Sequence, residues 1–262
     1  MKKILLSHMT WLEIEKIVKK KVVVLIPVGS VEAQNTHNPI GYDYLLAESL
    51  AMKAAQNCNA IVTPTINFGY SERFIGFPGV ISLKPSTLQA IFEDVLYSLV
   101  KTGFDHFLFI NGHEPNKTPL LYAASRIRDT FGIIFTTIWP TELARNFGKE
   151  LFENAKEVFM HGNEPSTSIL KYLFPELVRI EQIEKSPLPN DNEFKNFKLS
   201  SPTTLSHEGQ KVPIFLRLKD ISRTGGWGEP SGDSKKGEII FNKMVDFLIS
   251  FVKKYQEMNT HI

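Results

Sequence analysis

Apolar residues in this chain form short continuous runs, which alternate with longer stretches where they recur every three or four positions. The continuous runs occupy residues 22–27, 60–64, 106–110 and 133–138, and they lack the polar alternation of a half-exposed strand. Such runs are typical of parallel strands that helices cover on both faces. The helical stretches between them favour right-handed crossover connections. The pattern therefore predicts an α/β fold of three layers, with a mainly parallel sheet between helices.

Helices are predicted from residue spacing together with start and stop signals. Thr10 and Glu13 form a capping-box pattern at the start of a short helix that ends in the lysines at 19–21. Residues 181–224 are polar and irregular, so we expect an elaborated loop or a small antiparallel excursion there. We interpret residues 1–262 as a single domain. Further helices are expected over about residues 44–56, 85–99, 118–129 and 165–174.

Composition limits the class of protein. The formal net charge is only +2, from 30 Lys and Arg against 28 Asp and Glu, so the basic excess of a nucleic-acid-binding protein is missing. The single cysteine, Cys58, excludes an internal disulfide and a zinc site made of several thiolates. The first apolar run is too short for a signal peptide, and no apolar run approaches the ~18 residues of a membrane span. We expect a cytoplasmic protein with neither a nucleic-acid nor a membrane partner.

Polar residues follow the ends of two predicted strands, which is where α/β proteins build ligand sites. The first of these loops carries Glu32, Gln34 and Asp43, and the second carries His113. Glu, Asp and His together suit Zn, Mn or Fe, and a carboxylate such as Asp43 could bridge two ions. Considered singly, an acidic residue in a Gly- and Pro-rich loop is more often a turn former or a cap. The pattern alone leaves both interpretations open.

Further polar residues lie near the same predicted crevice. His161 and Glu164 precede the predicted helix at 165–174, so their side chains could reach the crevice from the start of that helix. Asn111 and Asn116 lie on either side of the turn histidine, and we expect them to orient this turn.

Several segments, in the same order along the chain, resemble the signatures of the creatininase (creatinine amidohydrolase) family. The resemblance implies an α/β fold and usually a homo-oligomer, either a hexamer or a dimer-based assembly. It also implies a binuclear metal centre that hydrolyses C–N bonds of amides, often cyclic ones. The similar segments are residues 27–32 with the spacing to Asp43, 69–72, 76–79, 111–113 and 226–230.

The resemblance also implies roles for individual residues. Glu32, Asp43 and His113 match the family's metal ligands, with Asp43 as the bridging ligand. Glu164 resembles a glutamate that many members contribute to the metal centre. His161 resembles a motif histidine that could shuttle protons near the leaving nitrogen; the alternative is a hydrogen-bond donor at a helix start.

The sequence departs from the family pattern at places close to the expected site. Gln34 stands where the family has a histidine that binds the second ion, and a neutral amide oxygen is a much weaker ligand. Pro115 stands where creatininases proper place a glutamate, which points away from creatinine as the substrate. Phe74 and Val80 replace a histidine and a threonine beside the pocket, which implies an altered substrate or none.

We therefore expect a metal-dependent hydrolase that cleaves a C–N bond of a small molecule, either a cyclic amide or an N-acyl compound. The expected ion is Zn, with Mn or Fe as alternatives, and the chain would hold one or two ions. His161 and Glu164 are the expected catalytic residues, and Ser71 and Trp227 are expected to support the substrate or the structure. The open alternatives are a one-metal or non-amide hydrolase, for example of an oxidised cyclic polyol, and a non-catalytic metabolite-binding relative.

Overall fold

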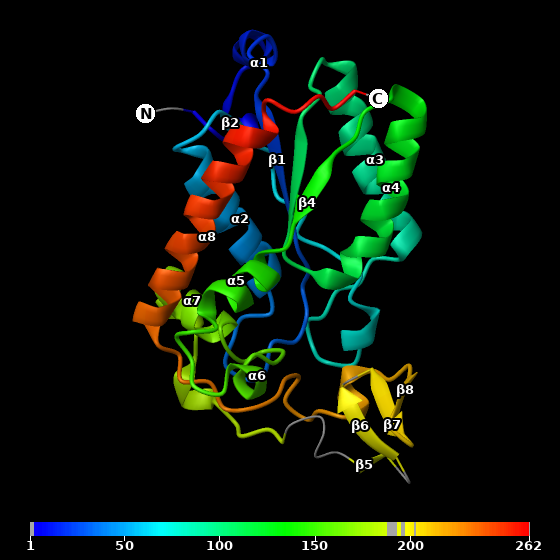
Figure 1. The fold of residues 1–262 in the computed structure, drawn as a ribbon, viewed down its shortest axis with the longest axis vertical. Coiled ribbons are helices and arrows are strands. Elements are labelled where there is room, and N and C mark those ends of the chain that lie inside the picture. The colour runs from blue at the N-terminus through cyan, green and yellow to red at the C-terminus, as the bar shows by residue number, and fades with distance from the viewer. Residues whose placement is uncertain (1–2, 188–192, 195–196, 202, 262) are drawn as a thin grey trace.

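The main body of the computed structural model is a four-stranded parallel sheet with helices on both faces (Figure 1). The strands β1 (Val23–Val28), β2 (Ala60–Val62), β3 (Phe107–Asn111) and β4 (Thr136–Ile138) lie in the order β2–β1–β3–β4. Each neighbouring pair is parallel, which confirms the predicted α/β fold, although β2 is shorter than the run at 60–64. The structure describes residues 3–187, 193–194, 197–201 and 203–261.

Strand β1 shows why the apolar runs are continuous. All six of its residues are buried. Val23 and Leu25 pack into the apolar cluster on one face of the sheet, whereas Val24 and Ile26 pack into the cluster on the other face. Because helices cover both faces, neither set of alternating positions meets water, and a polar residue would be buried at any of them.

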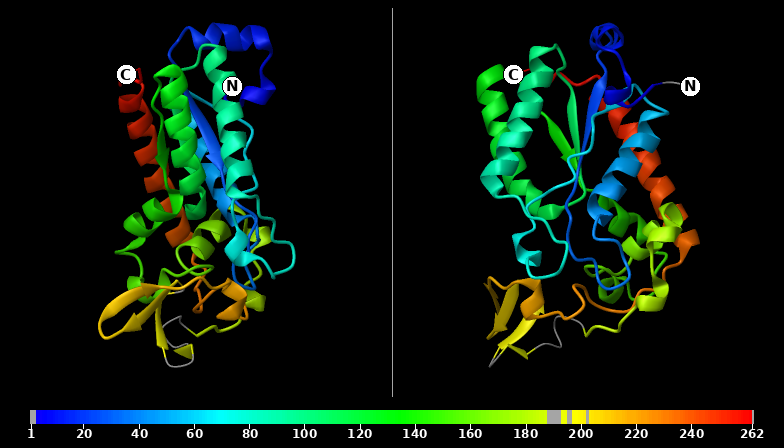
Figure 2. Two further views of the ribbon diagram at one scale, coloured as in Figure 1. Left: turned by 90° about the vertical axis from the view of Figure 1, so that its right-hand side faces the viewer. Right: turned by 180° about the vertical axis from the view of Figure 1, so that it is seen from behind.

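Two helices cover each face of the sheet (Figures 1 and 2). Helices α2 (Tyr42–Ala55) and α8 (Ser234–Tyr255) pack on one face, and α3 (Pro85–Lys101) and α4 (Lys117–Phe131) pack on the other. The predicted helices at 44–56, 85–99 and 118–129 are thereby confirmed with small changes of boundary, whereas α8 is an addition that was not predicted from the sequence. None of the helices in the described part of the chain is both long enough and apolar enough to span a membrane.

The remaining helices are shorter. Helix α1 (Trp11–Val18) begins at the predicted capping box, in which Thr10 and Glu13 exchange hydrogen bonds. Helix α7 (Ser166–Leu173) confirms the predicted helix at 165–174. Helices α5 (Pro140–Gly148) and α6 (Ala155–Val158) are further additions. Short 3₁₀ helices cover Leu6–His8, Glu72–Phe74, Glu114–Asn116, Pro175–Leu177, Ile180–Gln182 and Leu218–Asp220.

Two boundaries differ from the prediction for physical reasons. Helix α2 begins at Tyr42, so Asp43 lies in the first helical turn and not in the loop before it. In the run at 133–138 only the last three residues form β4, because Ile133 pairs with His261 in a separate antiparallel bridge. The first difference matters for the site, since a helical turn holds a side chain more rigidly than a loop does.

A small antiparallel sheet lies at one end of the molecule, below the main sheet in Figures 1 and 2. Its strands are β5 (Glu193–Phe194), β6 (Phe197–Ser201), β7 (Thr204–His207) and β8 (Gln210–Pro213), paired in sequence order. They fall inside the stretch 181–224, where a small antiparallel excursion was one of the two expectations. The interpretation of the whole chain as one domain stays a prediction.

Candidate metal centre

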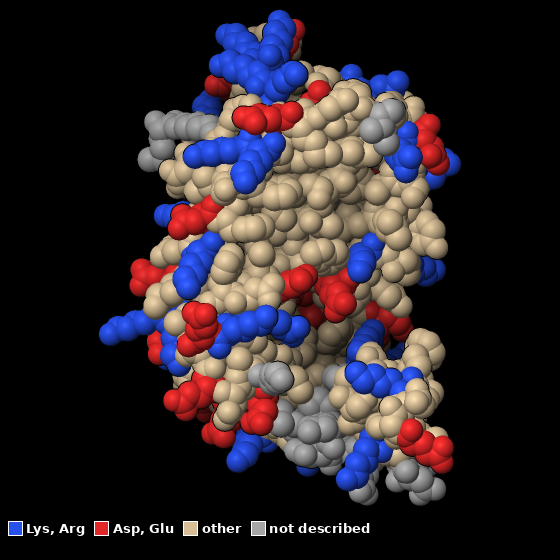
Figure 3. All heavy atoms as spheres, in the orientation of Figure 1, with Lys and Arg blue, Asp and Glu red and all other residues tan. Residues whose placement is uncertain are grey.

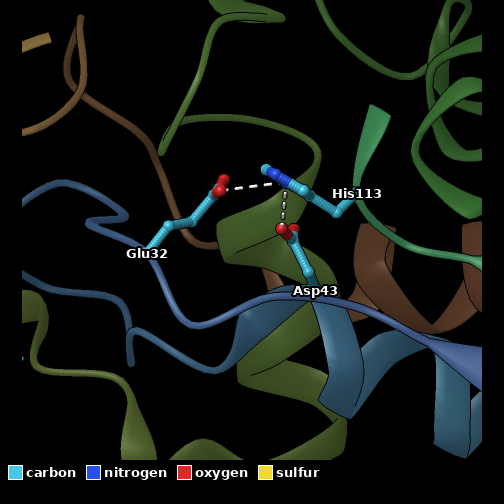
Figure 4. A group of neighbouring side chains, drawn as sticks. All are labelled: Glu32, Asp43 and His113. Atoms are coloured by element: carbon cyan, nitrogen blue, oxygen red, sulfur yellow. Dashed lines mark ion pairs between the residues drawn. The ribbon is translucent and has the colours of Figure 1, made fainter. Parts of the chain in front are cut away.

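Three buried side chains from separate segments point toward one another at the carboxyl ends of β1 and β3 (Figure 4). Glu32 lies in the loop after β1, Asp43 in the first turn of α2, and His113 in the turn after β3. Strands β1 and β3 are neighbours and are paired up to their last residues, so the segments that follow them leave the sheet side by side. One oxygen or nitrogen from each of the three side chains lies within 4.8 Å of the other two.

A close approach of two backbones brings Asp43 and His113 together. A Cβ at Gly112 would lie 2.1 Å from the carbonyl oxygen of Asp43, so only glycine allows the turn to pass this close to the start of α2. The residue directly after this glycine is His113, whose side chain therefore reaches Asp43. This contact is why glycine is required at position 112.

The two nitrogens of His113 have different partners. Nε2 lies 2.9 Å from the carbonyl oxygen of Tyr70; because a carbonyl only accepts, Nε2 carries a hydrogen. Nδ1 lies 2.9 Å from both Glu32 Oε2 and Asp43 Oδ2. Burial alone would lower the pKa of His113, but the charge of Glu32 and the hydrogen bonds to both carboxylates raise this pKa well above its usual value.

The two carboxylates respond to their surroundings in opposite ways. Burial, followed by the charge of Glu32, raises the pKa of Asp43 to about 7. Burial would also raise the pKa of Glu32, but the charge and the hydrogen bond of His113 lower it below its usual value. Ser30 donates a hydrogen bond of 2.6 Å to Asp43 Oδ2 and thereby orients this carboxylate.

This donor set fits a divalent cation. Glu32 and Asp43 direct one oxygen each at the same His113 nitrogen, which can hold only one hydrogen between them. A cation at this point would take the place of that hydrogen and would compensate two buried negative charges. Two carboxylates and one imidazole are a ligand combination used for zinc and manganese. The structure thus brings Glu32, Asp43 and His113 together in a group that could bind a metal ion.

Gln34 is buried beside this group and contacts one of its ligands. Its Nε2 donates a hydrogen bond of 3.0 Å to Glu32 Oε1. The amide therefore presents a donor to Glu32 and holds that carboxylate in place. In the described ranges, Glu32, Asp43 and His113 form the one group of three or more His, Cys, Asp or Glu side chains close enough to share an ion.

Glu164 is buried in a different place, and the structure does not bring it into this group. Its Oε1 accepts hydrogen bonds from Ser231 Oγ at 3.0 Å and from the Gly232 backbone N–H at 2.9 Å. Its Oε2 accepts from the backbone N–H of Ser168, in the first turn of α7, at 3.2 Å. A carboxylate is favourable at a helix N-terminus, and here it ties α7 to the segment before α8. These contacts give no support to the predicted ligand and catalytic roles of Glu164.

His161 lies at the edge of the metal-ligand group. Its Nδ1 is 4.0 Å from Glu32 Oε1. Its Nε2 lies 2.7 Å from the carbonyl oxygen of Ala33, so the hydrogen of the neutral ring is on Nε2. Burial lowers the pKa of His161 from its usual value, which favours the neutral ring at pH 7. Nδ1 is then a base on the side of the ring that faces Glu32.

Asn111 and Asn116 connect the histidine turn to neighbouring segments through hydrogen bonds. Asn116 Nδ2 donates to the carbonyl oxygen of Gly29 at 3.0 Å and to Asn111 Oδ1 at 3.2 Å. Asn116 Oδ1 accepts from the backbone N–H of Tyr70 at 3.0 Å. The backbone N–H of His113 in turn donates to Asn111 Oδ1 at 3.2 Å. The two amides thus link three segments that converge on the site.

A pocket of about 460 Å³ opens beside the metal-ligand group. Trp227 is buried in its wall. Ser71 does not line the pocket; it is buried and donates a hydrogen bond of 3.4 Å to Glu32 Oε2. Figure 3 shows a recess with acidic and basic side chains at its edge, between the main body and the small sheet. Other lining residues include the apolar Phe74, Trp139, Met160 and Leu218 and the cationic Arg73, Lys117 and Arg145.

Sequence reasoning missed the three cationic side chains of this pocket. The available signal was the place of Arg73 between Ser71 and Phe74, which were both singled out. Lys117 follows the asparagines of the histidine turn directly. Arg145 lies in α5, a helix that was not predicted, so nothing in the sequence analysis pointed to this side chain as part of the pocket.

Comparisons with known proteins identify the family of this chain. The family described as creatinine amidohydrolase matches residues 7–252. Creatinine amidohydrolase of Pseudomonas putida is 26% identical over 208 residues, which are 71% of this chain and 78% of that protein. A mycofactocin precursor peptide peptidase of Mycolicibacterium smegmatis is 30% identical over 246 residues, which are 89% of this chain and 85% of that protein. Two solved structures are also similar: a manganese form of creatininase, with a TM-score of 0.75, and a Zn–Zn type creatininase mutant, with a TM-score of 0.74. Each is 21% identical in sequence, and each match covers 97% of this chain and 98% of the matched chain.

Proposed function

Because the chain belongs to the creatininase family, we propose that it is a metal-dependent hydrolase that cleaves the C–N bond of a small amide or N-acyl compound and uses one bound ion. The observation that carries this proposal is the meeting of Glu32, Asp43 and His113 at one point, with His161 beside them. The two relatives described above also support it, since one is named an amidohydrolase and the other a peptidase.

Glu32 and Asp43 would hold the ion through carboxylate oxygens, and His113 would hold it through Nδ1. We propose Zn, with Mn or Fe as alternatives, and the manganese and Zn–Zn forms of creatininase support this choice. A divalent ion at such a site supplies Lewis-acid chemistry that makes water nucleophilic near neutral pH. The Tyr70 carbonyl keeps the hydrogen of His113 on Nε2, so Nδ1 is the nitrogen presented to the ion.

The proton transfers are assigned to His161. Its Nδ1 would accept a proton from the attacking water and would then deliver that proton to the leaving nitrogen. The carbonyl oxygen of Ala33 binds Nε2–H and so fixes both the tautomer and the ring orientation that these steps need. Ser30 and Gln34 hold the carboxylates of Asp43 and Glu32 during the reaction.

Two observations favour one ion over two. Gln34 uses its amide N–H to bind Glu32, and the carboxylate oxygens of Glu164 accept three hydrogen bonds elsewhere. The alternatives, a non-amide hydrolase and a non-catalytic relative, are distinguished from this proposal by the substrates that the protein hydrolyses.

The test combines metal counting with a panel of substrates. Plasma emission on the purified protein should find about one ion per chain. The zinc-loaded protein should hydrolyse an N-acyl amino acid or a cyclic amide in preference to an oxidised cyclic polyol, and EDTA should abolish the activity until zinc is restored. Full activity of Asp43→Ala would contradict the metal assignment. Two ions per chain would contradict the one-ion centre, and hydrolysis of the polyol alone would favour the non-amide alternative.

We further propose that the chain forms a homo-oligomer, either a hexamer or a dimer-based assembly. Three apolar side chains on or next to the small sheet support this: Phe215 is 98% exposed, Val212 46% and Phe197 39%. Light scattering coupled to size exclusion should find a multiple of 29.8 kDa, and a monomer at every concentration would contradict it. The cytoplasmic location and the absence of a nucleic-acid partner stay predictions.

A further inference from the structure

The pocket beside the metal-ligand group contains a cation that the proposed reaction does not use. Arg73 belongs to the 3₁₀ helix Glu72–Phe74 and lines the pocket. It is half-buried, whereas Lys117 and Arg145, which also line the pocket, are exposed. Of these three cations, Arg73 therefore has the side chain that is most enclosed by the pocket wall.

The chain neighbours of Arg73 place it beside the reacting groups. Ser71 donates a hydrogen bond of 3.4 Å to Glu32 Oε2, and the ring of Phe74 lies 4.8 Å from the ring of His161, centroid to centroid. The charge of Glu32 raises the pKa of Arg73 against the lowering caused by burial, and the charge of Arg73 in turn lowers the pKa of His161. An arginine side chain keeps its proton in proteins. The pocket therefore has a permanent positive charge near Glu32 and His161.

The same pocket wall is rich in hydrogen-bond donors. Trp227 Nε1 and Asn111 Nδ2 are both buried and have no hydrogen-bond partner among the described residues, and both side chains line the pocket. Buried donors in a native structure normally have an acceptor. Because the Glu32 and Asp43 oxygens are needed for the metal ion, a ligand with its own oxygen acceptors would complete this wall.

We propose that the substrate carries a free carboxylate, which Arg73 binds while the scissile amide lies against the Glu32–Asp43–His113 group. This inference rests on the proposed function and names its substrate class: N-acyl amino acids or short peptides with a free carboxyl end. The planar fork of a guanidinium matches a carboxylate with two parallel hydrogen bonds. A phosphate would bring about two negative charges to this one half-buried cation, which favours the carboxylate.

The size and the walls of the pocket agree with such a substrate. A volume of about 460 Å³ is within the usual range of small-molecule sites. Phe74, Trp139 and Trp227 offer apolar surface for a side chain. Lys117 and Arg145 at the rim would attract an anion from solution, although Glu114 and Glu142 also lie there.

The first test measures hydrolysis. N-formyl-phenylalanine and N-formyl-phenylalaninamide share the scissile bond and differ only in the free carboxylate. We expect the zinc-loaded protein to cleave the acid with at least about tenfold higher kcat/KM. Arg73→Gln should remove this preference by slowing the acid alone, and Arg73→Lys should retain part of it. Arg126→Gln, on the exposed surface of α4, is the matched control and should leave both rates unchanged. Equal loss of both substrates in Arg73→Gln would overturn the proposal.

The second test measures binding without turnover, so that it can be separated from the proposed function. Calorimetry would compare 3-phenylpropanoate with 3-phenylpropanamide on the zinc-loaded protein. We expect the acid to bind at least about tenfold more tightly, and we expect this difference to disappear in Arg73→Gln but not in Arg126→Gln.

Each outcome of the calorimetry is decisive. Equal affinities for acid and amide, or no binding of either, would overturn the carboxylate site. An acid preference that survives in Arg73→Gln would place the carboxylate at the metal ion and would also overturn it. Tighter binding of the matching phosphonate than of the carboxylate would refute the choice of carboxylate. Acid-selective binding through Arg73 without any hydrolysis would instead refute the proposed function and leave the binding site standing.

Discussion

The paired carboxylates predict an unusual effect of Asp43→Asn on the metal-free protein. Asp43 is buried, and burial together with the charge of Glu32 raises its pKa from 3.8 to about 7. A carboxyl group whose pKa rises on folding stabilises the folded protein below its unfolded pKa and loses this contribution as the pH rises toward the folded pKa. An asparagine cannot ionise, so the variant should not suffer this loss.

The magnitude follows from the width of that pH window. One pKa unit corresponds to about 1.36 kcal/mol. Between about pH 5 and pH 7, Asp43 is ionised in the unfolded chain and largely protonated in the folded one. The wild type should therefore lose about 3 kcal/mol of unfolding free energy relative to the variant over this interval. His113 acts in the same direction, because the substitution removes one of the groups that raise its pKa.

The assay is urea unfolding in EDTA at several pH values from 5 to 8. The unfolding free energy of the variant minus that of the wild type should increase by about 3 kcal/mol as the pH rises. Any cost of altering the hydrogen bond from Ser30 shifts the whole curve and leaves this gain unchanged. Asp94→Asn, on the exposed surface of α3, is the matched control and should follow the wild type at every pH. Parallel curves for Asp43→Asn and the wild type would refute the reasoning.

Zinc provides a second measurement on the same proteins. A ligand that binds only the folded state raises its apparent stability, so zinc should raise the unfolding midpoint of the wild type. It should raise the midpoint of Asp43→Asn much less, because one charged ligand is missing. The wild-type response should be larger at pH 8 than at pH 6, since binding must displace the hydrogen on His113 Nδ1. An equal zinc response in the variant would remove Asp43 from the metal site.

Three further substitutions test the other assignments. Gln34→His should leave the zinc content at about one ion per chain, because Glu164 is bonded elsewhere and cannot complete a second site; two ions by plasma emission would contradict this. His161→Gln should lower kcat by about 10²–10⁴-fold with unchanged zinc content, and a rate within a few-fold of wild type would exclude His161 as the proton shuttle. Glu164→Gln should lower the unfolding free energy by about 1–3 kcal/mol, because it sets an amide against the N–H groups of Ser168 and Gly232; loss of zinc in this variant would restore Glu164 as a ligand.

The local pattern of apolar residues was sufficient to predict the strands that are buried on both faces. The residues of β1 and β3 are all buried, and covered strands leave continuous apolar runs that need no knowledge of the partner. Helix α8 was missed, although its buried residues, among them Ile240, Met244 and Leu248, recur at helical spacing. The start of α2 was placed two residues late, because backbone hydrogen bonds begin the helix at Tyr42 without a capping side chain.

The sequence by itself, through its apolar pattern and its resemblance to a known family, brought forward five candidate metal ligands: Glu32, Gln34, Asp43, His113 and Glu164. The apolar pattern predicts the strands that precede Glu32 and His113 and the helix that adjoins Asp43. The carboxyl ends of adjacent parallel strands lie together at one edge of the sheet, independently of the conformation of the loops. The resemblance to a known family then narrowed the chemistry of these residues. The structure brings Glu32, Asp43 and His113 into one group, gives their distances and pKa shifts, and leaves Glu164 outside this group.

Only the tertiary structure decided what the neighbouring polar residues do. Glu164 is bound by the backbone N–H of Gly232, which is 68 residues further along the chain, and Gln34 turns its amide N–H to Glu32. Arg73 lines the pocket together with Glu32, from the loop after β1, and His161, because the fold brings these three segments together. The direction of a loop side chain depends on which distant segment offers a partner, and loops have no fixed period from which that partner could be read.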